Sequence, residues 1–276
     1  MPFNTNALIG FFGGIALLIT AIFLTSNSPV MYLNPEAAMI VVGGTLAASL
    51  ISYSYKQLGS AFSRVWRLLK PESIIGKDDI DVFIRVAALK QSGRLRAIED
   101  EIKNTSSPFI KTGLQLLADG MPPDDIVNVL ELRMRHQESI ERNEAGVFKT
   151  MATYTPAFGL SGTLIGLVNM LRMMGEGATP KQVGLNMSLA LVATFYGVVL
   201  ANGVLRPIAA KIELKTQDRM RVMGTIVEAL HSISEGRGSA HIREILYAIA
   251  ATYQDDIGHH DTLEAMSEKE LYGPES

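Results

Sequence analysis

Thr163 and Thr194 are the side chains best suited to chemistry inside the apolar parts of this 276-residue chain. Each lies in a long stretch of apolar and small residues, where a hydroxyl can offer an oxygen ligand to a cation or a hydrogen bond to a neighbour. Neither stretch contains Asp, Glu or His. If ions cross a membrane at this protein, the carboxylate that carries them must therefore come from another chain.

Small residues accompany both hydroxyls on one face of a predicted helix. Residues three or four apart share such a face, and small side chains let membrane helices approach closely. One interpretation is helix packing alone, because a threonine hydroxyl can also bond to its own backbone. The other is that a helix of a partner protein packs here and that the hydroxyls border the path of an ion. The two sets are Gly159, Thr163 and Gly166, and Ala190, Thr194, Gly197 and Ala201.

Two prolines, Pro156 and Pro207, lie in the same two stretches. A proline inside a helix leaves one backbone carbonyl without its helical partner and permits a kink. In membrane helices such features often accompany moving parts, which favours the second interpretation.

Composition and spacing exclude other kinds of chemistry. The chain has no cysteine, so it has neither disulfides nor thiolate metal sites. Its five histidines do not have metal-site spacing, and no nucleotide loop, nucleophile elbow or zinc motif occurs. The net charge of −3 argues against a nucleic-acid partner. We therefore expect no enzyme and no cofactor, which leaves the ion-motive force as the source of energy.

Apolar stretches of membrane-spanning length position these residues. Only 19% of the residues are charged, against about 25% in soluble proteins. The sequence predicts an all-α, polytopic membrane protein with four spans of about 18 to 20 residues or more. Short linkers join the first span to the second and the third to the fourth, giving two hairpins, 1–55 and 149–210. The predicted spans are 7–24, 37–55, 151–171 and 183–207.

Basic residues indicate the orientation of these spans. The linkers 25–36 and 172–182 carry only Arg172 and Lys181, whereas basic residues are frequent after the second and fourth spans and before the third. By the positive-inside rule, the linkers are external and both termini are cytoplasmic. The residues that follow the second span are Lys56, Arg64, Arg67 and Lys70.

The pattern of the middle segment, 56–148, predicts a large helical cytoplasmic domain. Residues 77–93 begin with Asp residues that suit a helix N-terminus and end at Gly93. A later helix begins near Pro123 and is expected to continue into the third span. The tail 211–276 is expected to be helical, with a stop near Gly236 and disorder after about residue 254.

The fourth stretch, "SLALVATFYGVVLANGVLRP" (188–207), resembles the signature of the MotA/PomA family of flagellar stator proteins. The segments "TPAFGLSGTLIGL" (155–167) and "IVVGG" (40–44) are similar to the third and second spans of that family. Together with the four-span arrangement, the resemblance covers the chain to about residue 235. The positions that match the signature are Ala190, Leu191, Ala193, Thr194, Gly197, Val199 and Pro207.

This resemblance implies a stator subunit in the bacterial inner membrane that couples H⁺ or Na⁺ flow to torque on the flagellar rotor. It implies a single-span MotB/PomB-like partner that supplies the ion-carrying Asp beside the third and fourth spans. It also implies contact with the rotor switch protein and a ring of five copies around a dimer of the partner. The carboxylate that these spans lack would then belong to the partner.

The resemblance also implies roles for single residues. Pro156 and Pro207 match the prolines that couple ion flow to movement, and Thr163 and Thr194 match the hydroxyls of the third and fourth spans. An ungapped alignment places the first rotor-contacting acid of the family on Ile98, which has no charge. The alternative interpretation, that the charges of the loop only form a solvated helix face, therefore stays open. The candidates for rotor contact are Lys90, Arg94, Glu99 and Glu101.

Two other functions and the identity of the ion stay open. An ExbB/TolQ-like energiser of outer-membrane processes uses the same ion flow, although those relatives typically have three spans. A membrane scaffold without transport is the third possibility. Thr163 favours Na⁺, because that ion needs several oxygen ligands, whereas Ala193 stands where PomA has a further Thr.

Overall fold

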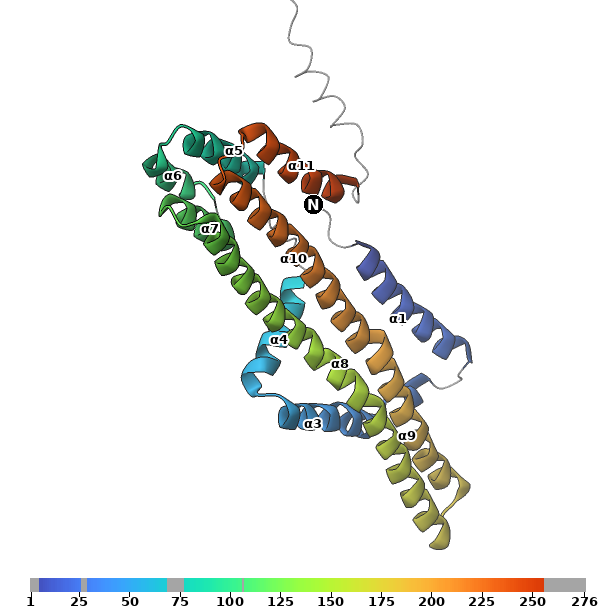
Figure 1. Ribbon diagram of the computed structural model, residues 1–276. Coiled ribbons are helices and arrows are strands. Elements are labelled where there is room, and N and C mark those ends of the chain that lie inside the picture. Colours follow the sequence, from blue (N-terminus) through green and yellow to red (C-terminus); the bar gives the residue numbers. More distant parts are fainter. Residues whose placement is uncertain (1–4, 26–28, 69–76, 106, 256–276) are drawn as a thin grey trace, which may run out of the picture. The chain divides into compact units, whose positions relative to one another are not determined.

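The computed structural model describes residues 5–25, 29–68, 77–105 and 107–255. Over these residues the chain consists of helices and the turns that join them (Figure 1), which confirms the predicted all-α class. The chain forms two compact units, and each unit combines two separate stretches of sequence. Unit 1 is Met1–Glu72 with Glu138–Thr216, and unit 2 is Ser73–Gln137 with Gln217–Ser276.

Unit 1 contains the apolar stretches and the segment that follows the second of them. Two long helices, α8 and α10, continue from this unit into unit 2. The first stretch of unit 1 holds α1 (Thr5–Thr25), the 3₁₀ turn η1 (Pro29–Tyr32), α2 (Pro35–Ala38), the π-helical turn η2 (Met39–Gly43), α3 (Gly44–Ser52) and α4 (Tyr55–Leu68). The second holds most of α8 (Pro123–Gly175), α9 (Pro180–Val199), the π-helical turn η3 (Leu200–Leu205) and the start of α10 (Arg206–Ser234).

Local signals explain where several of these helices begin and end. Asn34 caps α2 by accepting a hydrogen bond from the Ala37 amide at 3.0 Å, and Pro35 occupies the first helical position. Pro180 starts α9 in the same way. The predicted span 37–55 ends three residues early, because Tyr53 has an extended backbone (φ −134°, ψ 146°) that stops α3.

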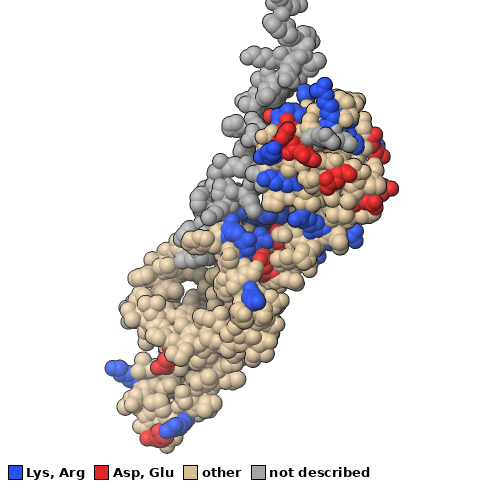
Figure 2. Space-filling view, turned by 90° about the vertical axis from the view of Figure 1, so that its left-hand side faces the viewer, with Lys and Arg blue, Asp and Glu red and all other residues tan. Residues whose placement is uncertain are grey.

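Three helical segments among the described residues are long and apolar enough to cross a membrane. Their outward side chains include Leu160 and Leu171 of α8 and Leu191 of α9, each about 60% exposed. Figure 2 shows a broad part of this surface that is nearly free of charged residues. Such a surface suits contact with lipid. The segments are Pro29–Ser52, Pro123–Gly175 and Pro180–Ser234, and a shorter apolar helix, Ala16–Thr25, covers part of the first predicted span.

The helix beginning at Pro123 continues through the third predicted span without a break, as predicted. The fourth span contains a feature that was not predicted, the π-helical turn η3 directly before Pro207. Proline has no N–H, so the carbonyl of Gly203, four residues earlier, receives no hydrogen bond from it. A wider turn at this point accommodates the proline while the chain stays helical.

Unit 2 is a helical domain with its own apolar core. Phe83, Ile110 and Leu230 are among its fully buried side chains. The predicted stops at Gly93 and Gly236 are confirmed, since both have positive φ angles, 71° and 82°. The predicted disorder after residue 254 concerns residues 256–276, which lie outside the described part of the chain. The helices of unit 2 are α5 (Lys77–Gln91), α6 (Leu95–Ile102), α7 (Pro108–Ala118), the beginning of α8, the end of α10 and α11 (Ser239–Asp255).

Candidate ion pathway and the contacts that support it

The two hydroxyls singled out in the sequence lie together between α8 and α9. Thr163 Oγ1 and Thr194 Oγ1 are hydrogen-bonded to each other. Thr163 Oγ1 also lies 3.0 Å from the carbonyl oxygen of Ala190 and 3.3 Å from that of Gly159. Thr194 Oγ1 lies 3.5 Å from the same Gly159 oxygen. The site therefore gathers four oxygen atoms, two from hydroxyls and two from the backbone.

These oxygens come together because α8 and α9 approach each other very closely. A Cβ atom on Gly159 would lie 2.9 Å from the carbonyl oxygen of Ala193, and one on Gly197 would lie 3.0 Å from that of Thr155. Contacts this short to backbone atoms cannot be relieved by rotating a side chain. Glycine at both positions is thus a condition of the geometry that joins Thr163 to Thr194.

The small residues expected to receive a partner helix have a different place in the structure. All five are buried against helices of their own chain. Gly159, Gly166, Ala190 and Gly197 pack between α8 and α9, and Ala201 belongs to an apolar cluster with Leu58 and Phe148. The stripes meet each other, so helix packing within the chain accounts for them. Among the exposed residues of these spans are the larger side chains Leu160 and Leu191.

The two prolines lie in different surroundings. Pro156 is half-buried inside α8, which stays helical through it. The residue before it, Thr155, is fully buried, and its hydroxyl donates to the Met151 carbonyl at 2.6 Å and lies 3.4 Å from the hydroxyl of Thr45 on α3. Pro207 is exposed and follows η3 at the start of α10.

The four candidate rotor contacts lie on α5 and α6 of unit 2, around the turn at Gly93. Lys90 is in the last turn of α5, and Arg94 precedes the first residue of α6. Glu99 and Arg94 are exposed. Glu101 is held within the unit, since it pairs with Arg85 at 2.9 Å and accepts a hydrogen bond from the Asn104 amide at 3.0 Å.

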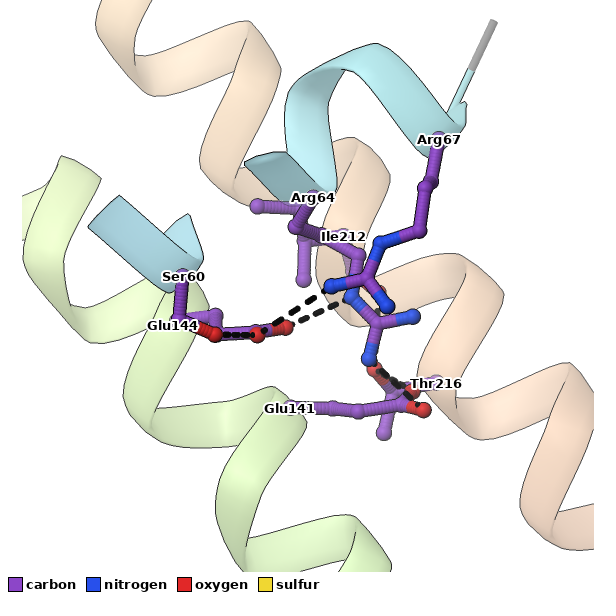
Figure 3. A network of polar contacts seen from close by, with 7 residues as sticks. All are labelled: Ser60, Arg64, Arg67, Glu141, Glu144, Ile212 and Thr216. Carbon is purple, nitrogen blue, oxygen red and sulfur yellow. Dashed lines mark hydrogen bonds and ion pairs between the residues drawn. The ribbon is translucent and has the colours of Figure 1, made fainter. Parts of the chain in front are cut away.

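One prominent cluster was missed by the sequence analysis, which used Arg64 only to orient the spans. Arg64 of α4 is buried between two buried carboxylates of α8 (Figure 3). Its Nη2 lies 2.8 Å from Glu141 Oε1 and its Nε lies 2.6 Å from Glu144 Oε2. Ser60 donates to Glu144, and Thr216 of α10 donates to Glu141 at 2.8 Å. We call these five residues the α4–α8–α10 network.

The charge state of Arg64 follows from this arrangement. Burial by itself lowers the pKa of the guanidinium, but the hydrogen bond to Glu144 and the charges of both carboxylates outweigh burial and raise the pKa above its usual value. Arg64 therefore stays charged at any physiological pH. A signal for the network was present in the sequence, because Arg64 lies at helical spacing from the apolar residues Leu58, Ala61 and Leu68.

A tyrosine of α9 holds the linker between the first two spans. Tyr196 accepts a hydrogen bond from the Asn34 amide at 3.1 Å and donates one to the carbonyl of Tyr32. The ring of Tyr32 also packs edge-on against Phe195, with centroids 6.0 Å apart. The linker is thereby fixed to the fourth predicted span.

Comparison with known proteins identifies relatives with this sequence and fold. A profile of the MotA/TolQ/ExbB proton channel family matches residues 101–225. Chemotaxis protein PomA of Vibrio alginolyticus is 32% identical over 238 residues, covering 83% of this chain and 88% of that protein. Motility protein A of Treponema phagedenis is 28% identical, covering 83% and 86%. The structure of C. jejuni MotAB has a TM-score of 0.80 at 19% identity, covering 93% and 97%, and so shows the same fold.

Proposed function

The chain belongs to the MotA/PomA family of flagellar stator proteins, and from this premise we propose in detail how it serves as an ion-conducting subunit of the flagellar motor. It is a membrane protein and a motor component, not an enzyme. The main observation in support of an ion pathway is the pair of hydroxyls of Thr163 and Thr194 between α8 and α9. The predicted spans of these helices contain no Asp, Glu or His.

An ion pathway of this kind is incomplete by itself. The hydroxyl and carbonyl oxygens can replace part of an ion's water, but they cannot hold a negative charge or exchange a proton. We infer that a single-span partner of the MotB/PomB kind places an Asp beside α8 and α9. The small residues of the stripes face each other, so the partner's helix would pack on the larger exposed side chains, among them Leu160, Leu164 and Leu191. A ring of five copies around a dimer of the partner is the assembly we propose.

We propose Na⁺ as the ion. A sodium ion needs several oxygen ligands to replace its hydration shell, whereas a proton needs only the partner's carboxylate. Four oxygens gathered at Thr163 and Thr194 support this choice. The buried methyl of Ala193 supplies no further ligand, so the partner and water would complete the shell.

The membrane topology is part of the same proposal. We propose four spans in two hairpins, 1–55 and 149–210, with the segment 56–148, the tail 211–276 and both termini in the cytoplasm of a bacterial inner membrane. The distribution of Lys and Arg supports this orientation. The charges of Arg94 and Glu99, which are exposed, and of the partly exposed Lys90 would then be available to the rotor switch protein.

A gene deletion tests the stator function against the remaining alternatives. Loss of this chain from its native bacterium should leave cells that carry flagella but do not swim, and the wild-type gene should restore swimming. An ExbB/TolQ-like energiser would instead give normal swimming and a defect in outer-membrane processes. A scaffold without transport would affect neither.

A further inference from the structure

Arg64 lies at a point where three helices are fastened together by buried charge. Its two nitrogens bind carboxylates that are three residues apart on α8, so both lie on the same helix face. The residues are buried to less than 8% exposure for Arg64 and less than 5% for Glu141 and Glu144. Thr216 extends the network to α10, and Lys215 of α10 donates to the backbone carbonyl of Leu68 at the end of α4 at 3.0 Å.

This arrangement fixes the register of α4 on α8. Sliding either helix by one turn would separate the guanidinium from both carboxylates at once. Burying such charges is costly, and well-packed apolar residues often stabilise a fold equally well or better. A buried ion network is therefore weak evidence for a gain in overall stability. Charged groups instead specify one geometry, because the planar guanidinium of an arginine can donate hydrogen bonds to both carboxylates only when they occupy particular positions.

The place of the network along the chain gives this geometry a use. Glu141 lies near the start of the unit 1 part of α8, and Thr216 is the last residue of unit 1 on α10, and each helix also extends unbroken through residues of unit 2. In the opposite direction, α8 extends to Thr163 at the candidate ion pathway, and η3 connects α10 to α9, which carries Thr194. On α8, and along the chain from α9 through η3 to α10, the network thus lies between the candidate ion pathway and the residues of unit 2.

We propose that Arg64 is a positioning residue of the motor. By pairing with Glu141 and Glu144 it holds α8 and α10 in fixed register on α4, so that movement driven by the ion reaches the cytoplasmic helices instead of being lost as sliding between helices. This inference rests on the proposed stator function, but it concerns how ion flow is coupled to torque and not whether ions flow.

The most informative variant removes the three buried charges of the network together, so that none of them is left without its partner. Arg64→Gln would leave Glu141 and Glu144 without their buried counter-charge and could prevent folding. The triple variant Arg64→Met, Glu141→Gln, Glu144→Gln removes all three charges together, and Arg64→Lys keeps the charge but lacks the two-pronged fork. Each variant is expressed with the partner subunit in motile cells, and torque per stator is measured from the steps in speed of a bead on a flagellar stub. The number of assembled stators and the ion influx are measured in the same cells.

In the triple variant we expect stators that assemble and conduct ions but lose torque per stator, because movement of α8 and α10 is then lost as sliding between helices. Arg64→Lys should give a smaller loss. The matched control is Arg142→Gln, which removes an arginine of α8 that lies between the two glutamates but is exposed and pairs along its own helix with Glu138. It should leave torque unchanged.

Three results would overturn the inference. One is normal torque per stator in the triple variant. Another is a fall in stator number with normal torque per stator, which would make the network a matter of stability alone. The last is an equal loss of torque per stator in Arg142→Gln, which would mean that the overall charge of this region, and not the network, determines the torque. A wild-type chain that neither conducts ions nor drives rotation with its partner would instead contradict the proposed function.

Discussion

The hydroxyls of Thr163 on α8 and Thr194 on α9 are hydrogen-bonded to each other across the two helices. This contact is possible only because glycines bring the helix backbones together, and it places both side chains next to the carbonyls of Gly159 and Ala190. The packing of small residues and the candidate ion pathway are therefore one structural feature, and a change to either should affect the other.

The close approach of α8 and α9 predicts that Gly159→Ala destabilises the protein. The added Cβ would lie 2.9 Å from the carbonyl oxygen of Ala193, so the backbones must separate. Overpacking of this kind costs about 1 to 3 kcal/mol. Thermal unfolding of the detergent-solubilised protein should show a lower midpoint. Gly184→Ala, where a Cβ meets no atom within 4 Å, is the control and should not lower it; equal midpoints for both variants would show that the helices do not depend on Gly159.

The helix boundaries followed from the sequence because their signals are local. Gly93 and Gly236 end helices through positive φ angles, and the absence of proline between Pro123 and Pro156 allowed one continuous helix. The spacing of Thr163 and of Thr194 from the small residues of their own helices predicted that each threonine shares a helix face with those residues. The structure brings these two faces together.

What the sequence did not reveal depends on contacts between distant segments. A stripe of small residues does not say which helix it meets, so packing within the chain and packing of a partner's helix both stayed open, and the structure shows that the stripes meet each other. Arg64 and Glu144 are 80 residues apart in sequence, and no local pattern pairs them. The π-helical turn before Pro207 is one of several ways in which a helix accommodates a proline, and α8 passes through Pro156 without such a turn, so the proline alone does not predict it.

The linker contact predicts a modest loss of stability in Tyr196→Phe. The change removes hydrogen bonds to the Asn34 amide and the Tyr32 carbonyl while keeping the ring. We expect a loss of about 1 to 3 kcal/mol, since each of the two hydrogen bonds contributes about 0.5 to 1.5 kcal/mol, and faster cleavage of the linker by external protease. Tyr55→Phe, at a side chain that is 74% exposed, should change neither quantity. Linker cleavage at the wild-type rate in Tyr196→Phe would mean that the tyrosine does not hold the linker.

Sodium dependence should be visible in swimming speed at fixed membrane potential. With the wild-type chain we expect speed to rise with external Na⁺ and then saturate. Thr163→Ala removes one of the four oxygens and should shift the curve to higher Na⁺ concentration. Ser161→Ala is the control, since its exposed hydroxyl bonds to the carbonyl of Ala157 on its own helix. A speed that does not depend on Na⁺ in the wild type would make the proton the ion and leave Thr163 as a packing residue.

Rotor contact predicts different behaviour for Glu99 and Glu101, two of the three acidic residues of α6. Glu99 is exposed, so Glu99→Lys should reduce swimming, and an opposite charge change on the rotor should partly restore it. Glu101 pairs with Arg85, so Glu101→Lys should also lower the stability of the domain, and a rotor change should not correct that loss. Full motility after neutralising Lys90, Arg94 and Glu99 together would show that these charges only face solvent.

The central claim is that this chain forms the wall of an ion pathway whose charged group belongs to a partner. Ion flux into liposomes tests it directly, with the purified chain alone, with the chain co-purified with its single-span partner, and with a partner whose intramembrane Asp is changed to Asn. We predict flux only with the chain and the unaltered partner together. Robust flux of Na⁺ or H⁺ through the chain alone would contradict the claim.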